Sequence, residues 1–301
     1  MASFRRELAW RAEAAAFAVF GAALRLLPVD AASGLGGALG RLLGPLTGAH
    51  RVAARNIEIA FPELDAAHCA RLLRAQWDNT GRTFFELPIA DRLTEASGRL
   101  EIAGRGVLEA VARDPGPTVL VSGHFANWEV MAAAFTAAGV DALVTYRAAN
   151  NPYVDAMIRR ARARYGVRLF APKGAEGSRA LMAALEGGAA VAIMNDQKFN
   201  GGVAVPFFGR LAHTAVGPSR LALRFDAPIV LMSVQRLRGA RFRVTAHPPI
   251  RLERTGARAV DLEAGVRRIT AFVEAQVRAN PAQWFWVHKR WPVEAYTSPP
   301  P

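Results

Sequence analysis

The chain has 301 residues, 51% of them hydrophobic and 21% charged, which is typical of a folded protein with a sizeable core and excludes a disordered chain. Its single cysteine, Cys69, excludes an internal disulfide and a zinc site made of thiolates, and the chain is compatible with a reducing compartment. The formal net charge of +13 indicates an anionic partner, such as a membrane surface or a phosphorylated substrate, although a strong arginine bias can also be genomic composition without a function.

An uninterrupted apolar run from Ala14 to Leu24 lies near the N-terminus, between Arg11 and Arg25. It is shorter than the roughly 20 residues that a membrane-spanning helix needs. The run therefore predicts a helix that lies in the membrane interface with its basic flanks on the headgroups, or one that spans with Arg25 snorkelling. A secretory signal peptide is the alternative, but the helical pattern continues past the run without a clear cleavage site.

The segment from Ser33 to Pro45 is also apolar and is rich in glycine. It predicts a second helix that touches the membrane or packs tightly against a neighbour. We therefore expect residues 1–45 to form a membrane-associating helical segment, followed by one larger domain over residues 46–301.

The sequence pattern of the larger domain predicts an α/β fold with a central mixed sheet flanked by helices. The pattern from Asp65 to Leu87 predicts a helix with Asp65 as its N-cap. Strand and helix patterns then alternate, with short Gly and Pro punctuation between them. The expected segments are, in order, a strand at 98–104, a helix to about 113, a strand at 118–122, a helix from 128, a strand at 141–146, a helix from 152, a strand at 189–194 and a helix at 262–278.

One stretch, Val119 to Phe135, combines a strand, a turn and a helix start, and within it His124 is followed five positions later by Glu129. Asn127 suits the N-cap, which puts Glu129 in the first helical turn and leaves His124 on the preceding loop. This placement matters because five steps along one helix rotate a side chain by about 500°, or roughly 140° off its starting face. A loop histidine can fold back on a first-turn glutamate.

Such a pair suits general-base chemistry. An imidazole with a pKa near 6.5 accepts a hydroxyl proton at neutral pH if a partner fixes its tautomer and stabilises the imidazolium. We expect Glu129 to be that partner for His124, and the free N–H groups of the helix start to hold an oxyanion or a phosphate. The small residues Ser122 and Gly123 allow a substrate to approach the backbone.

The spacing of the pair is weak support when taken alone. With 6 His and 25 acidic residues in 301, chance produces it about 0.5 times in such a chain. A structural His–Glu pair without catalysis is therefore the alternative that these residues leave open.

Seven segments with distinctive sequences lie within about residues 50–292: RNIEIAFPEL, SGHFANWE, TYRAANNP, MNDQ, GGVAVPFFG, TAVGPSRLA and NPAQWFWVHKRW. In their order they resemble the late acyltransferases of lipid A biosynthesis, the lauroyl/myristoyl transferase family. That family shares an H-x4-D/E motif with the glycerolipid acyltransferases. The F-x-E-G-T-R phosphate motif of the glycerolipid enzymes is absent from this sequence, which disfavours a glycerol-3-phosphate acceptor.

The resemblance implies a glycerolipid-acyltransferase-like fold and an O-acyltransferase on the cytoplasmic face of the inner membrane. It implies transfer of a fatty acyl chain from acyl carrier protein to a hydroxyl of a lipid A precursor or related glycolipid. His124 is then the base, with Glu129 beside it, and no metal or organic cofactor is required. Phosphatidylinositol mannosides or lysophospholipids are alternative acceptors. A non-catalytic basic protein that binds membranes or nucleic acid is a second alternative, although the scattered arginines disfavour nucleic acid.

Five residues are candidates for substrate contacts. Arg147 follows a predicted strand, so we expect it at the same sheet edge as His124, where α/β proteins bind ligands. Arg162 occupies a position that the resemblance favours as functional. Asp196, Gln197 and Lys198 follow the AAVAIM run. An aspartate after a strand can simply cap a turn, but the resemblance places Asp196 and Gln197 in the active-site region. It thus implies that Asp196 orients Arg147 or the substrate, and we expect Lys198 to neutralise a phosphate.

The pair Phe207 and Phe208 precedes Gly209 in the PFFG segment. We expect it to form the wall of an acyl-chain groove, with ordinary core packing as the alternative.

Overall fold

The computed structural model describes residues 2–114, 116–146, 148–167, 170–172 and 174–297. The strands of its main sheet are β1 (Leu100–Ala103), β2 (Thr118–Ser122), β3 (Ala142–Tyr146), β4 (Phe170–Pro172), β5 (Ala190–Met194), β8 (Ile229–Arg236) and β9 (Phe242–Ala246). In the described part of the chain these seven strands follow the order β1-β9-β8-β2-β5-β3-β4. Strands β8 and β9 run antiparallel, and the other neighbouring pairs run parallel. The predicted central mixed sheet is confirmed.

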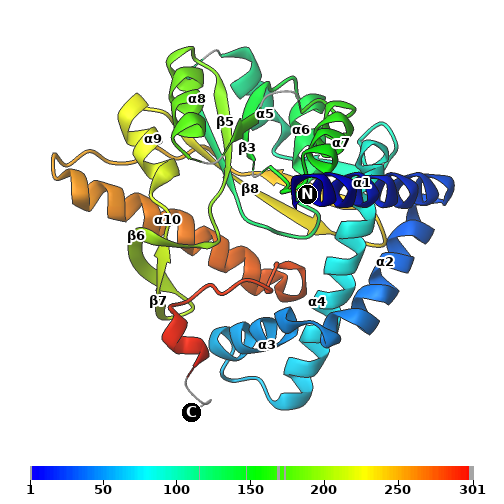
Figure 1. Cartoon of the computed structure of the whole chain (residues 1–301). Coiled ribbons are helices and arrows are strands. Elements are labelled where there is room, and N and C mark those ends of the chain that lie inside the picture. The colour runs from blue at the N-terminus through cyan, green and yellow to red at the C-terminus, as the bar shows by residue number, and fades with distance from the viewer. Residues whose placement is uncertain (1, 115, 147, 168–169, 173, 298–301) are drawn as a thin grey trace.

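Helices cover both faces of this sheet (Figure 1). The helices after β1 are α5 (Arg105–Arg113), α6 (Val130–Ala137), α7 (Pro152–Ala163), α8 (Ala175–Glu186), α9 (Gly217–Phe225) and α10 (Arg258–Ala279). On β2, Leu120 belongs to the same apolar cluster as α5 and α6 residues, while Val119 and Val121 belong to the cluster of α8, α9 and α10. Because both faces of β2 are covered, its five residues are all buried, which explains the unbroken apolar run in the sequence.

A helical layer precedes the sheet in the chain. It comprises α1 (Ala2–Leu26), α2 (Val29–Leu43), α3 (Gly48–Ala60) and α4 (Ala66–Glu86), with the short 3₁₀ helices η1 (Gly44–Leu46) and η2 (Leu87–Arg92). The predicted cap of α4 is confirmed, because the Asp65 side chain accepts a hydrogen bond of 2.7 Å from the backbone N–H of His68.

Helix α2 packs closely against α4 through glycines. A Cβ added at Gly81 would collide with the carbonyl oxygen of Gly36, and one added at Gly36 would lie 2.6 Å from Cβ of Phe85. Small residues at these positions allow the two helix backbones to approach each other. Tight packing therefore explains the glycine-rich sequence of α2. The division of the chain at residue 45 stays a prediction.

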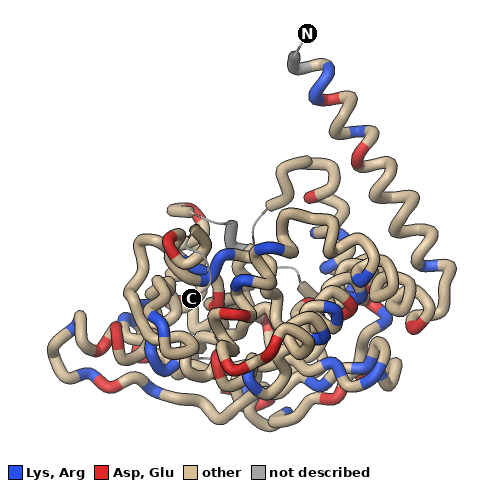
Figure 2. Tube along the Cα trace, turned by 90° about the horizontal axis from the view of Figure 1, so that it is seen from below, with Lys and Arg blue, Asp and Glu red and all other residues tan. Residues whose placement is uncertain are grey.

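Helix α1 lies across η2 and α7, and its first turns extend beyond the body of the protein (Figure 2). Its C-terminal end is fixed by Arg25, whose guanidinium donates two hydrogen bonds of 2.7 Å to Asp91. Phe4, Leu8 and Val19 are largely exposed on the same helix. Among the residues that the structure describes, no helix is long and apolar enough to cross a membrane.

A second sheet is the hairpin of β6 (Lys198–Phe207) and β7 (Arg210–Thr214). Phe208 and Gly209 form its turn with φ values of 51° and 71°, as a two-residue hairpin requires. Phe207 and Phe208 are buried against aromatic rings that include Trp284 and Trp286. They belong to the core, so the expected groove wall is not found there.

The C-terminal segment closes the same core. After α10 come η3 (Pro281–Gln283) and η4 (Val293–Tyr296). Between these elements, Trp284, Trp286, Arg290 and Trp291 are at most 1% exposed. This aromatic and basic segment is therefore an integral part of the fold.

Candidate active site

The candidate site lies where β2 and β5 end. These strands pair in parallel with Ser122 opposite Met194, so their C-terminal loops leave the sheet side by side. The first loop carries His124 and the second carries Asp196. Parallel register thus brings together two residues that are 72 positions apart in the sequence.

His124 and Asp196 make two direct contacts. The ring Nδ1 of His124 lies 2.7 Å from Oδ1 of Asp196, and the main-chain N–H of His124 donates to Oδ2 at 2.8 Å. Burial of the carboxyl opposes its ionisation, but the charge and hydrogen bonds of His124, assisted by the charge of His288, hold the pKa of Asp196 below its usual range. Asp196 is therefore a carboxylate at neutral pH.

The ionised state of Asp196 determines the tautomer of His124. A carboxylate can only accept hydrogen bonds, so the proton between these two side chains belongs to Nδ1 of the imidazole. In the neutral imidazole, this assignment leaves a lone pair on Nε2. A base on Nε2 and an orienting anion on Nδ1 are the arrangement that general-base catalysis requires.

Glu129 has other partners than the expected one. Arg162 donates from Nε to Oε2 at 2.8 Å and from a terminal nitrogen to Oε1, and the hydroxyl of Tyr165 donates to Oε2 at 2.8 Å. No hydrogen bond or ion pair joins His124 and Glu129, both of which the structure describes. The expected contact between Glu129 and His124 is therefore not made, and Asp196 lies on Nδ1 in its place. A catalytic role for Glu129 stays a prediction.

The start of α6 explains this difference. The helix begins at Val130, two residues later than the sequence predicts, because a tight turn precedes it. In that turn the Asn127 side chain accepts from the N–H of Glu129 at 3.2 Å, and the N–H of Met131 donates to the carbonyl of Trp128. The turn therefore uses N–H groups that were expected to hold an oxyanion.

Arg162 and Glu129 form a partly enclosed ion pair between α7 and α6. Their side chains are 19% and 7% exposed. Burial lowers the pKa of Arg162, but the charge of Glu129 reverses this effect and raises it. The guanidinium also lies over the ring of Tyr146, 4.8 Å from its centroid. Arg162 is thus held by the protein on two sides.

The loop of His124 is held by α4 and by the C-terminal segment. Ala126 has a φ of 44°, a conformation that a non-glycine residue keeps only when its surroundings impose it. Its N–H donates to the carbonyl of Gln283 at 2.6 Å, and its carbonyl accepts from the hydroxyl of Thr83 at 2.9 Å. The side chain of Asn127 donates to Glu86 at 2.9 Å.

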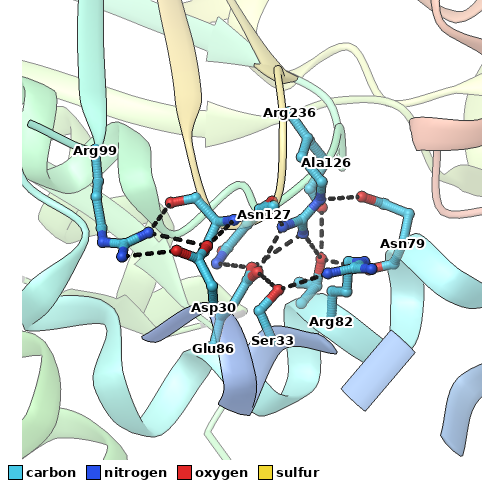
Figure 3. Close-up of polar contacts among 12 residues, drawn as sticks. Asp30, Ser33, Asn79, Arg82, Glu86, Arg99, Ala126, Asn127 and Arg236 are labelled. Atoms are coloured by element: carbon cyan, nitrogen blue, oxygen red, sulfur yellow. Dashed lines mark hydrogen bonds and ion pairs between the residues drawn. The ribbon is translucent and has the colours of Figure 1, made fainter. Parts of the chain in front are cut away.

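Glu86 is the centre of a buried polar network beneath this loop (Figure 3). Its carboxylate accepts from Arg236 of β8 and from Ser33 of α2, the latter at 2.6 Å. Glu86 is fully buried, and Arg236 is 9% exposed. The network joins α2, α4 and the sheet to Asn127, so the N-terminal helices support the loop that carries His124.

An apolar cavity of about 690 Å³ opens beside His124. Arg162, Gln197 and Lys198 line it together with His124. Its apolar walls come from β2, β3, β5, β8 and α6, and they include Leu120, Met131, Phe135, Val144, Ala192 and Met232. The cavity is thus polar beside the imidazole and apolar between the sheet and α6.

An aromatic surface also adjoins His124. Its rings are Trp128, 5.0 Å from the imidazole centroid, and Phe285, 5.5 Å from Trp128. Phe84 of α4 continues this surface and is 48% exposed. His124 therefore adjoins both the apolar cavity and an aromatic surface.

The predicted substrate-contact residues have different outcomes. Gln197 and Lys198 line the cavity, and their contacts to a substrate stay predictions. Asp196 is buried on His124, which differs from the expectation that it orients Arg147 or the substrate. Arg147 lies outside the described residues.

Sequence reasoning missed three residues that shape the site: Glu86, Tyr165 and Trp284. Trp284 donates its indole N–H to Asp196 at 2.8 Å. The aromatic and basic composition of residues 281–292 marked this segment as unusual, but no local pattern indicates its distant partners.

Comparison with known proteins identifies the family. No curated protein matches the chain. The family described as bacterial lipid A biosynthesis acyltransferase matches residues 1–292. Because this match covers nearly the whole chain, the protein belongs to the bacterial lipid A biosynthesis acyltransferase family and is an acyltransferase of lipopolysaccharide biosynthesis.

Proposed function

We propose that the protein transfers a fatty acyl chain from acyl carrier protein to a hydroxyl of a lipid A precursor, at the cytoplasmic face of the inner membrane. One observation carries the proposal. The buried carboxylate of Asp196 lies on Nδ1 of His124, and His124 lines the apolar cavity. A general base therefore adjoins a space that suits an acyl chain.

The proposed reaction needs one base and no covalent intermediate. Nε2 of His124 takes the proton of the acceptor hydroxyl while its oxygen attacks the thioester carbonyl. The tetrahedral intermediate then expels the thiolate of the carrier, which takes the proton from Nε2. Asp196 keeps Nδ1 protonated and stabilises the imidazolium between the two steps.

The cavity and the aromatic surface beside His124 suit the two substrates. We assign the acyl chain to the cavity, because its walls are apolar residues of the sheet and α6. We assign the acceptor to the aromatic surface of Phe84, Trp128 and Phe285, where Phe84 is 48% exposed and the other two rings are partly buried. The hydroxyl and the thioester would then meet at the imidazole.

Lys198 is our candidate for contact with an anionic group of a substrate. It lines the cavity with His124 and Gln197. Arg162 also lines the cavity, but its guanidinium binds Glu129 in a bidentate pair. We therefore assign Arg162 a role in positioning α7 against α6 and leave the direct contact to Lys198.

Exposed apolar side chains on the N-terminal helices support membrane association. They are Phe4, Leu8, Val19, Phe20, Leu26, Leu35, Leu42, Leu43 and Leu46, on α1, α2 and η1. Large apolar side chains exposed on consecutive helices are typical of a surface that binds a membrane or a partner. The net charge of +13 adds attraction to anionic lipids.

The activity test combines acyl carrier protein thioesters with defined acceptors. Purified protein should acylate a lipid A precursor, detected by mass spectrometry, and His124→Ala should lose transfer while keeping the thermal unfolding of the wild type. Phosphatidylinositol mannosides and lysophospholipids in parallel reactions test the alternative acceptors. A folded His124→Ala variant with normal turnover would overturn the assignment of the base.

Membrane association has a separate test. Leu42→Glu combined with Leu46→Glu should reduce cosedimentation with anionic vesicles, because both side chains are more than half exposed on the proposed surface. Leu211→Glu is the matched control, since Leu211 is 58% exposed on β7. Equal vesicle binding by the wild type and both variants would contradict this membrane surface.

A further inference from the structure

We infer that Trp284 is a positioning residue, which acts on the reaction by holding Asp196 against His124. The inference rests on the proposed function, because it assigns the base to His124. Trp284 itself is fully buried and lies behind the Asp196 carboxylate, so it acts only through its neighbours.

The hydrogen bonds of Asp196 show how Trp284 acts. Oδ1 of Asp196 lies on Nδ1 of His124, and Oδ2 accepts both the main-chain N–H of His124 and the indole N–H of Trp284, each at 2.8 Å. These contacts fix both oxygens and therefore the plane of the carboxylate. Without the indole N–H, Oδ2 loses a donor in a site where water cannot easily replace it.

The backbone around Trp284 also holds the loop of His124. Trp284 forms an antiparallel bridge with Phe125. The N–H of Phe285 donates to the carbonyl of His124 at 3.1 Å. One short segment therefore fixes the backbone that carries the imidazole and, through the indole, the carboxylate that orients it.

The surroundings of Trp284 leave its indole one orientation. Its ring packs edge-on against Trp286 at 4.6 Å and against His288 at 5.2 Å, and Phe207 lies 5.6 Å away. An aromatic ring enclosed in this way loses little further entropy when it makes a hydrogen bond. The donor is thus preorganised toward Asp196 before substrates bind.

Trp286 provides a matched control for the rival explanation that Trp284 only fills the core. It is also fully buried in the same segment, but its indole N–H donates to the carbonyl of Pro281 at 2.7 Å. Changing either tryptophan to phenylalanine removes the same atoms and one hydrogen bond. The two variants differ in whether that bond ends on Asp196.

The first measurement compares kinetics and stability. Trp284→Phe should lower kcat by about 10–100-fold, because small displacements of a base are costly, while KM for donor and acceptor changes less than about twofold. Trp286→Phe should keep kcat within about twofold of the wild type and lose a similar amount of thermal stability. Equal kcat losses in both variants would overturn the inference.

The second measurement tests action through the carboxylate. In an Asp196→Asn background, Trp284→Phe should change the residual rate by less than about twofold, because the group it holds is already altered. The same fold-loss in both backgrounds would show an independent structural role. If the wild type acylates no acceptor, the proposed function fails. If the wild type is active and Trp284→Phe is equally active, only the inference about Trp284 fails.

A third measurement needs no activity. In protein labelled with ¹⁵N-histidine, the Nδ1 proton of His124 should give a low-field resonance in the wild type and in Trp286→Phe. It should shift or broaden in Trp284→Phe. An unchanged resonance in the Trp284 variant would contradict the inference, even for a variant too unstable for kinetic assays.

Discussion

The imidazole of His124 is oriented by Asp196, whose Oδ1 lies 2.7 Å from Nδ1, and not by Glu129 on the same turn. The pairing depends on the parallel register of β2 and β5, which aligns Ser122 with Met194. His124, our proposed base, and Asp196 are therefore held by the sheet, whereas Glu129 binds Arg162 of α7.

This geometry ranks the two acidic residues. Asp196→Asn should lower kcat by about 10²–10⁴, because an amide can offer an N–H to Nδ1 and so favour the tautomer whose Nε2 cannot accept a proton. Glu129→Gln should lower kcat less, since Glu129 does not contact the imidazole. Steady-state rates of the two purified variants check the order, and a larger loss for Glu129→Gln would contradict it.

The ion pair of Glu129 and Arg162 should contribute mainly to stability. Glu129→Ala leaves a guanidinium that is only 19% exposed without its carboxylate, which should lower the free energy of unfolding by about 3–5 kcal/mol. Adding Arg162→Ala should recover part of the loss, because it removes the unpaired charge. Urea unfolding of the single and double variants measures both effects.

An exposed pair provides the control for that prediction. Glu263 and Arg267 form an ion pair on α10, with side chains 42% and 49% exposed. Glu263→Ala should change the free energy of unfolding by no more than about 0.5 kcal/mol. Similar losses at Glu129 and Glu263 would mean that the buried pair has no special role.

Half-buried His288, whose two ring nitrogens are buried without a hydrogen-bond partner among the described residues, should make stability depend on pH. Burial lowers the pKa of His288 from 6.5 to about 4. As the pH falls below 6.5, the unfolded chain binds this proton first, so unfolding becomes easier. The contribution of His288 to the free energy of unfolding, on the order of 3 kcal/mol, is complete above pH 6.5 and is lost progressively as the pH falls toward 4.

Urea unfolding between pH 7.5 and 4.5 tests this dependence. His288→Phe should flatten the curve in that window, because the variant has no imidazole to protonate. His247→Phe is the comparison, since burial lowers the pKa of His247 as well and it contributes in the same direction. A curve for His288→Phe as steep as that of the wild type would show that other groups cause the pH dependence.

Local patterns in the sequence predicted the elements whose causes are local. The cap at Asp65 preceded α4 as expected, and the apolar run at Thr118–Ser122 forms a strand because both of its faces are covered. Strand β6 gave no such signal, because its first residues are exposed and do not alternate. Local patterns therefore do not indicate the hairpin, although its turn at Phe208 and Gly209 lies in the PFFG segment.

The partners within the site could not be predicted, because they depend on strand order and register. His124 and Asp196 are 72 positions apart, and Trp284 reaches Asp196 from 88 positions away. The five-residue spacing of His124 and Glu129 was the available local signal, and it led to the wrong partner. The tight turn before Val130 directs Glu129 to Arg162.

The glycines between α2 and α4 give the last prediction. Gly81→Ala should lower the free energy of unfolding by about 1–3 kcal/mol or more, because the new Cβ collides with the backbone of Gly36 and no side chain can move aside. Gly34→Ala should instead raise stability by about 0.5–1 kcal/mol, since Gly34 lies within α2 with open space at its Cβ position and alanine favours helix.

Gly81→Ala should also reduce kcat, because α4 carries the Glu86 that holds Asn127 in the loop of His124. Urea unfolding and steady-state kinetics on both variants test this coupling, and normal stability of Gly81→Ala would show that α2 is not seated on α4 as described.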